Sequence, residues 1–160
     1  MNARLNRLAE RIRSELDELE RVVFRVEEGW QRVVRSGDDY YLDGVALNLH
    51  GFYAGLERTF ELIATAVDGR RPEGENWHQA LLQQMTVEVP AIRPAVISEA
   101  VCGQLDEYRG FRHVVRNVYT FKFDPAKVGR LVAFAPVLFR PVRAELLAFA
   151  EFLEHLQDQG

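Results

Sequence analysis

The chain has 160 residues, of which 48% are hydrophobic and 28% charged, a balance typical of a folded domain rather than a disordered one. Its formal net charge of −4 argues against a generally basic nucleic-acid-binding protein, so any contact with a nucleic acid must use a local patch. We expect residues 1–160 to form a single domain.

Cysteine content and hydropathy restrict the cellular setting. Cys102 is the only cysteine, so neither an internal disulfide nor a cysteine-based metal site can form, and its apolar neighbours predict a packed thiol. Residues 1–20 are charged throughout, and the apolar runs are far shorter than the roughly 20 residues that span a bilayer. We therefore expect a cytoplasmic protein that makes no contact with a membrane.

A long amphipathic helix is expected over residues 2–35. Its hydrophobic residues recur at three- and four-residue spacing, which favours pairing with another long helix. They are Leu5, Leu8, Ile12, Leu16, Leu19, Val22, Val23, Val26, Trp30, Val33 and Val34. The turn that follows predicts a left-handed Gly37, and Asp38 or Asp39 is expected to cap the next helix.

A second helix is expected over residues 39–67. It contains Gly51 and Gly55, and a glycine inside a helix costs about 1 kcal/mol relative to alanine. Their four-residue spacing therefore predicts that another helix approaches closely at this point. The polar, glycine-containing residues 68–74 predict the loop that ends the helix.

The middle of the chain predicts two further helices. A short helix is expected over residues 76–85 with Asn76 as its cap, and two prolines predict an extended loop over residues 88–97. Ser98 and Glu99 are expected to open a fourth helix that runs to about Phe121.

The last helix is expected to begin at Asp124-Pro125, where a capping residue precedes a proline, and to run to about Leu156. Pro136 and Pro141 predict that it is kinked or divided. Because no segment shows two-residue alternation, we expect an all-α fold, a bundle of four long helices and a short one.

The fourth helix carries the most unusual polar surface of the chain. On a helical wheel with about 100° per residue, six polar side chains fall within an arc of about 160°. They are Arg109, Arg112, His113, Arg116, Asn117 and Tyr119, and the opposite side holds Phe111, Val114, Val115 and Val118. One face is thus suited to packing, while the other combines three guanidinium groups with an imidazole, an amide and a phenol.

This polar face has two interpretations. It is either a solvated surface whose arginines pair with acids elsewhere, or a site for phosphodiester cleavage without a metal. A guanidinium can hold a phosphate through two hydrogen bonds, and an imidazole can move a proton near neutral pH. An amide can orient a polar atom of the substrate.

The remaining imidazoles give weaker signals. His50, His78, His113 and His155 are the only histidines, and none of them has the paired spacing of a metal site, so we expect neither a metal nor a cofactor. We expect His50 and His78 to pack or to hydrogen-bond between helices. His155 is expected to complement the dipole at a helix end.

Three segments, in order, resemble HepT-like toxins of the HEPN superfamily. They are ALNLHGFYAGLERTFELIA, ENWHQALLQQM, and FRHVVRNVY followed by FKFDP. The signature of the superfamily is an Arg followed, after four to six residues, by a His, often continued as x-Tyr. Here the run reads Arg112-His113-Val114-Val115-Arg116-Asn117-Val118-Tyr119.

The resemblance implies a function as well as a fold. It implies an all-α homodimer whose two motif helices form a shared cleft, and metal-independent endoribonuclease action on RNA as the toxin of a toxin–antitoxin system. The implied partner is a cognate minimal nucleotidyltransferase antitoxin, which in some systems adds AMP to the motif tyrosine, here Tyr119. The candidate catalytic residues are Arg112, His113 and Asn117, and the candidate substrate-binding residues are Arg109, Arg116 and Tyr119.

Asn117 stands where the signature has His. Asparagine cannot act as a general acid or base near neutral pH, and loss of such help typically costs about 10²–10⁴ in rate. Three explanations stay open: His113 supplies the proton function, the protein is a weak or inactive ribonuclease, or Asn117 is an introduced substitution.

The alternative function is a non-catalytic HEPN module that binds a nucleotidyltransferase, a nucleotide or RNA. A third reading is a helical structural protein in which Arg112 and Arg116 only form ion pairs, away from any cleft.

Overall fold

The computed structural model describes residues 2–158, and these residues contain five α-helices and no named strand. The helices are α1 (Asn2–Ser36), α2 (Tyr40–Ile63), α3 (Trp77–Gln84), α4 (Glu99–Asn117) and α5 (Pro125–Asp158). A π-helical turn, Ala64–Asp68, continues α2, and a short 3-10 turn, Thr120–Lys122, precedes α5. The predicted all-α bundle is confirmed, and none of the described helices is long and apolar enough to cross a membrane.

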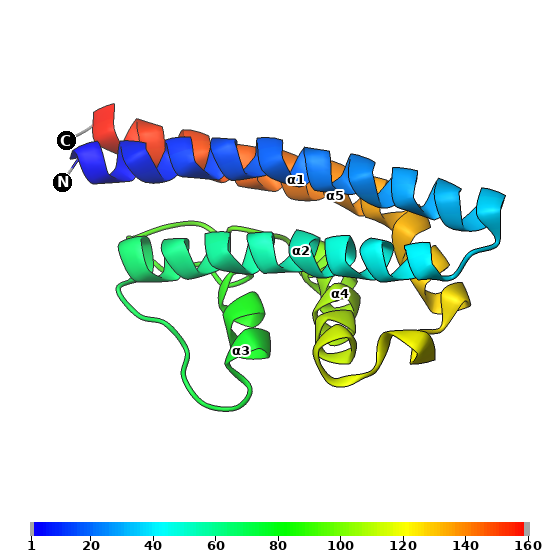
Figure 1. Cartoon of the computed structure of the whole chain (residues 1–160). Helices are drawn as coiled ribbons and strands as arrows, with labels where there is room; N and C mark the ends of the chain where they lie inside the picture. The colour runs from blue at the N-terminus through cyan, green and yellow to red at the C-terminus, as the bar shows by residue number, and fades with distance from the viewer. Residues whose placement is uncertain (1, 159–160) are drawn as a thin grey trace.

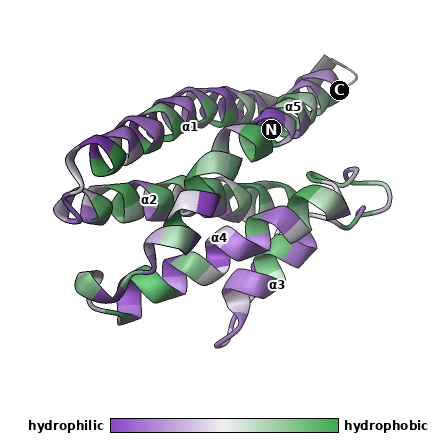
Figure 2. Cartoon of the chain, turned by 90° about the vertical axis from the view of Figure 1, so that its right-hand side faces the viewer, coloured by the Kyte–Doolittle hydropathy of each residue, from purple (hydrophilic) through white to green (hydrophobic). Residues whose placement is uncertain are grey.

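Helix α2 is the central element. In Figure 1, α1 and α5 lie side by side on one side of α2, while α3 and α4 extend from its other side. The ring of Phe52 in α2 packs edge-on against Tyr108 of α4 at 5.6 Å and against Phe139 of α5 at 6.1 Å. Figure 2 shows that hydrophobic and hydrophilic residues alternate along α1 and α4, as expected of helices that bury one face.

The expected pairing of the first helix is confirmed, because α1 packs along both α2 and α5. A Cβ atom added to Gly55 would lie 2.9 Å from Cδ2 of Leu19 in α1, so the absence of a side chain allows the two helices to approach. A Cβ atom at Gly51 would meet nothing within 4 Å. The predicted close approach is therefore correct at Gly55 and wrong at Gly51.

The predicted helix starts are largely confirmed by their hydrogen bonds. Gly37 has a left-handed φ of 67°, and Oδ1 of Asp38 accepts a hydrogen bond from the backbone N–H of Tyr40 at 2.9 Å. Ser98 caps α4 by accepting from Val101 at 3.2 Å. Oδ1 of Asp124 accepts from the backbone N–H of Ala126 at 3.0 Å, at the start of α5. Asn76 occupies the cap position of α3, but its side chain makes no capping hydrogen bond.

Helix α4 is shorter than the sequence predicts, since it ends at Asn117 rather than near Phe121. Val118 and Tyr119 have extended backbone conformations, with ψ values of 141° and 143°. Val118 and Thr120 are β-branched and favour extended backbone over helix. Tyr119 consequently lies outside α4, and the prediction that it shares the polar face of that helix with Arg112 and Arg116 was wrong.

Helix α5 continues without interruption through Pro136 and Pro141. Each proline removes one backbone hydrogen-bond donor, and Figure 1 shows the ribbon changing direction as it runs from the 3-10 turn to its place beside α1. Of the two predicted outcomes, the kinked helix is observed and the divided helix is not.

The loop of residues 85–98, between α3 and α4, is fixed by a buried ion pair. Arg93 is 3% exposed, and its Nε and Nη2 donate to the carboxylate of Asp68 at 2.5 and 2.8 Å. Its remaining N–H groups donate to the backbone carbonyls of Val87, Pro94 and Gln84. Burial by itself raises the pKa of Asp68, but hydrogen bonds from Arg93 and Gln84 outweigh it and hold that pKa below its ordinary value.

We expect Arg93→Ala to lower the free energy of unfolding by about 3–5 kcal/mol, because it leaves the buried carboxylate of Asp68 without its cation. Urea denaturation followed by circular dichroism measures this change. The matched control is Arg71→Ala, since Arg71 pairs with Glu61 at 3.1 Å but its side chain is 57% exposed. The control should cost less than about 1 kcal/mol. Equal losses in the two variants would contradict a structural role for the buried pair.

Candidate functional site

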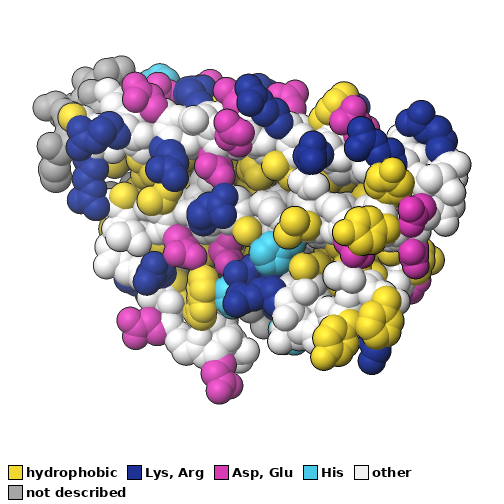
Figure 3. Space-filling view, viewed as in Figure 1, with side chains coloured by type: hydrophobic (Ala, Val, Ile, Leu, Met, Phe, Trp, Pro, Cys, Tyr) yellow, Lys and Arg dark blue, Asp and Glu magenta, His cyan; other side chains and the backbone are white. Residues whose placement is uncertain are grey.

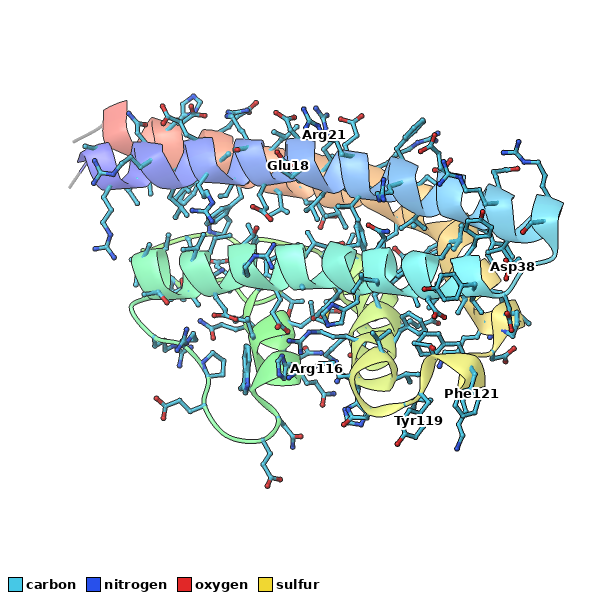
Figure 4. The ribbon with its side chains drawn as sticks, viewed as in Figure 1. Glu18, Arg21, Asp38, Arg116, Tyr119 and Phe121 are labelled. Carbon is cyan, nitrogen blue, oxygen red and sulfur yellow. The ribbon has the colours of Figure 1, made fainter. Side chains whose placement is uncertain are left out.

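A polar cleft of about 400 Å³ lies between α3 and α4. Its lining residues are Glu75, Asn76, His78, Gln79, Arg109, Arg112, His113, Arg116 and Asn117. Figure 3 shows arginine atoms gathered around a histidine and acidic side chains near α2, and Figure 4 places the side chain of Arg116 between α3 and α4. Five of the six residues selected from the sequence are thus brought together, and Tyr119 is the exception.

A buried carboxylate lies behind two of the residues that line the cleft. Glu57 projects from α2 and is 4% exposed, and its Oε2 lies 2.8 Å from Nδ1 of His78 in α3. Its Oε1 lies 3.9 Å from Nη1 of Arg112 in α4. One buried negative charge therefore binds side chains from two other helices.

The three arginines of α4 differ in their partners. Nε of Arg109 donates to Oδ1 of Asp106, one turn earlier, at 2.7 Å. Arg112 is held over Glu57, and its buried Nε has no hydrogen-bond partner among the described residues. Arg116 is exposed and forms no ion pair within residues 2–158. Arg112 thus lies against a carboxylate of its own chain, as the structural reading expects, whereas both Arg112 and Arg116 line a cleft, which that reading does not expect.

His113 and Asn117 contact each other one turn apart on α4. The side-chain nitrogen of Asn117 donates to the backbone carbonyl of His113 at 2.8 Å and lies 3.3 Å from Nδ1 of the His113 ring. When the amide donates to Nδ1, a neutral His113 carries its proton on Nε2. In that form His113 is a hydrogen-bond donor toward the cleft rather than a base.

His50 lies behind the arginines on α2. Its Nε2 is buried and has no hydrogen-bond partner among the described residues. Burial and the nearby guanidinium groups of Arg112 and Arg116 lower its pKa from the ordinary value of 6.5, against a smaller opposing effect of Glu57. His50 is therefore held in its neutral form near neutral pH.

Tyr119 and Phe121 lie beyond the end of α4. Their rings stack with centroids 5.8 Å apart, and they are 73% and 77% exposed. Figure 4 shows both side chains on the outer edge of the segment after α4, away from Arg116. They form an exposed aromatic pair that is separate from the lining of the cleft.

Two other residues noted in the sequence lie outside the cleft lining. Cys102 is 5% exposed, and burial raises the pKa of its thiol, so the predicted packed thiol is confirmed. His155 is exposed near the end of α5, and its Nδ1 lies 2.8 Å from the carbonyl of Glu151. Within residues 2–158, no three His, Cys, Asp or Glu side chains are grouped to hold a metal ion.

Comparison with known proteins identifies the family. A model of the HepT-like protein family matches residues 44–153, a range that contains every residue lining the cleft. The chain belongs to the HepT-like protein family. This is a family of HEPN-type toxins, so the resemblance seen in the three sequence segments is confirmed. Neither a curated protein nor a solved structure gives a significant match.

Sequence reasoning did not identify Glu57 beside this HepT-like cleft. The expectation that His78 packs or hydrogen-bonds between helices is confirmed by its contact with Glu57, but His78 was not selected as a residue of the site. A signal for Glu57 was present, because it follows the buried Tyr53 by four residues and precedes the buried Phe60 by three. An acid on the apolar stripe of a helix requires a buried partner. The partner itself could not be identified, since His78 is 21 residues away along the chain.

We expect His50 to make the HepT-like fold less stable in mild acid. The unfolded chain takes up a proton at the ordinary pKa of 6.5, while the native state resists protonation, so stability falls as pH drops below that value. The free energy of unfolding, measured by urea titration at about pH 7.5 and about pH 5.5, should therefore fall less in His50→Gln than in the wild type. His155→Gln, which alters an exposed residue outside the cleft, should retain the wild-type dependence. An unchanged dependence in His50→Gln would contradict this assignment.

Proposed function

We propose that this HepT-like protein is the toxin of a toxin–antitoxin system and acts in the cytoplasm as a metal-independent endoribonuclease. The observation that carries the proposal is the convergence of Arg109, Arg112 and Arg116 on one cleft of a chain whose net charge is −4. Concentrated positive charge in a concave site attracts a polyanion and orients its phosphates. Membership of a HEPN-type toxin family supports RNA as that polyanion.

The chemistry available in the cleft fits phosphodiester cleavage. Arg112 is restrained by Glu57, so its guanidinium is oriented before a substrate arrives. Arg116 is exposed at the same cleft and is available to a second phosphate oxygen. Fixed cations of this kind stabilise the additional negative charge that develops on phosphorus in the transition state.

A homodimer is part of the proposal. The cleft is bordered on one side by exposed residues of α4, and the stacked Tyr119 and Phe121 expose apolar surface at the end of that helix. Exposed aromatic side chains of this kind are enriched in protein interfaces. A second copy that packs here would bring the two motif helices together and enclose the cleft.

We expect Arg112→Ala to reduce cleavage of single-stranded RNA by at least about 100-fold in the presence of EDTA, because a fixed transition-state contact is lost. Asn117→His restores the family's motif residue and should raise the cleavage rate by adding a proton-transfer group. The rates are measured from the decay of a fluorescently labelled RNA of mixed sequence.

Arg130→Ala is the matched control, since Arg130 is an exposed arginine of α5 that does not line the cleft. Arg112→Lys keeps the charge but loses the forked geometry, so it should recover only part of the rate. The catalytic assignment is wrong if neither Arg112→Ala nor Asn117→His alters the cleavage rate.

A second candidate function is a non-catalytic module that binds a nucleotidyltransferase, a nucleotide or RNA. It is favoured by Asn117, whose amide cannot exchange a proton and is bonded to its own helix. The exposure of Tyr119 is compatible with either function, because a partner nucleotidyltransferase can reach its hydroxyl in both cases. Binding of RNA without cleavage, in the wild type and in Asn117→His, would select this candidate.

We expect the cognate nucleotidyltransferase to add AMP from ATP to Tyr119, because this hydroxyl lies on an exposed segment outside the helical bundle. Intact-mass spectrometry should show an added adenylyl group in the wild type and none in Tyr119→Phe. Tyr40→Phe is the control, since Tyr40 is 76% exposed but lies far along the chain from the motif. Modification that survives in Tyr119→Phe would assign the site to another residue.

A further inference from the structure

We infer that His78 of α3, oriented by the buried Glu57, is the proton-transfer residue of this cleft, in place of the histidine that α4 lacks. The inference rests on the proposed ribonuclease function and adds to it a catalytic residue on a different helix. Three observations support it: the contact with Glu57, the fixed position of the ring beside Arg112, and the environment of the other imidazoles.

The contact with Glu57 determines which nitrogen of His78 carries the proton. Oε2 of Glu57 lies 2.8 Å from Nδ1, and an ionised carboxylate can only accept a hydrogen bond. Nδ1 must then be the protonated nitrogen, and in the neutral ring the lone pair is on Nε2. The carboxylate thus prepares Nε2 to act as a base and stabilises the imidazolium that forms when it takes a proton.

The ring of His78 is also held in position. The indole of Trp77 stacks on it with centroids 3.6 Å apart, and Nη1 of Arg112 lies 3.4 Å from Nδ1 and 3.5 Å from Nε2. The side chain keeps 26% exposure and lines the cleft. A phosphate bound by Arg112 would therefore place its adjoining ribose near Nε2.

The other two imidazoles near the cleft lack this arrangement. His113 is exposed, its Nδ1 lies 3.3 Å from the amide nitrogen of Asn117, and it forms no ion pair with a carboxylate among the described side chains. His50 has a buried Nε2 and does not line the cleft. His78 is the imidazole in the cleft lining that combines partial exposure, a carboxylate behind it and a guanidinium beside it.

The proposed step is a transesterification within the RNA strand. Nε2 of His78 takes the proton of a ribose 2′-hydroxyl, and the 2′-oxygen forms a bond to phosphorus while the bond from phosphorus to the 5′-oxygen breaks. The departing 5′-oxygen takes a proton from water, and the imidazolium of His78 returns its proton to the resulting hydroxide. The products are a 2′,3′-cyclic phosphate and a 5′-hydroxyl, and Arg112 stabilises the charge on the phosphoryl oxygens throughout.

The test combines kinetics with a measurement that does not depend on activity. His78→Gln should lower the cleavage rate of single-stranded RNA in EDTA at least about 100-fold, while the affinity for that RNA stays within about threefold of the wild type. His155→Gln, a matched change at an exposed imidazole of α5 outside the cleft lining, should keep its cleavage rate within about threefold of the wild type. Nitrogen-15 NMR of the wild-type histidines should show the proton of neutral His78 on Nδ1.

Each result has a definite meaning. Cleavage that survives in His78→Gln, or is lost equally in His155→Gln, overturns the role of His78 and leaves the ribonuclease proposal intact. A proton on Nε2 of neutral His78 overturns the inference even if His78→Gln fails to fold. A wild-type protein that binds RNA without cleaving it overturns the ribonuclease proposal, and the catalytic role of His78 falls with it.

Discussion

The arrangement of α2, α3 and α4 depends on the buried charge of Glu57. A carboxylate inside a helical core is strongly destabilising unless cations or hydrogen-bond donors surround it, and those near Glu57 are His78 and Arg112. These two residues belong to different helices: α3 packs mainly on α2 and α4, while α4 also packs on α5, where the hydroxyl of Tyr108 donates to the carbonyl of Leu131 at 2.7 Å. The contacts of this one acid therefore link α2 to both walls of the cleft, and the same contacts orient His78 and Arg112.

A second buried charge fixes the connection between the same two helices. Arg93 uses all of its donors within the fold, binding Asp68 at the end of α2 and carbonyl groups of the loop that joins α3 to α4. The same loop is anchored in the core by Met85, Val96 and Ile97, which are at most 2% exposed. Arg93 thereby joins Gln84, the last residue of α3, to Asp68, the last residue of the π-helical turn that continues α2.

The sequence predicts local features of this protein better than its long-range contacts. The helices and the polar face of α4 follow from three- and four-residue periodicity, which short stretches of chain encode completely. Glu57 and His78 could not be paired in this way, because their contact depends on how α3 folds back against α2. The wrong placement of Tyr119 has a local cause. The helical wheel holds only if α4 continues past Tyr119, whereas the helix ends at Asn117, since Val118 and Thr120 favour extended backbone.

The absence of the motif histidine from α4 does not by itself remove proton transfer, because the residues in and behind the cleft come from three helices. The signature on α4 describes one wall of the site, and phosphate binding by Arg112 requires that wall to be correct. Proton transfer requires only that an imidazole with a free lone pair lie within reach of the ribose, whichever helix supplies it. A carboxylate on α2 that orients an imidazole on α3 satisfies this condition without any change in the arginines. Asn117 can then stabilise the end of α4 and face His113, because the geometry of the cleft no longer requires that position to exchange a proton.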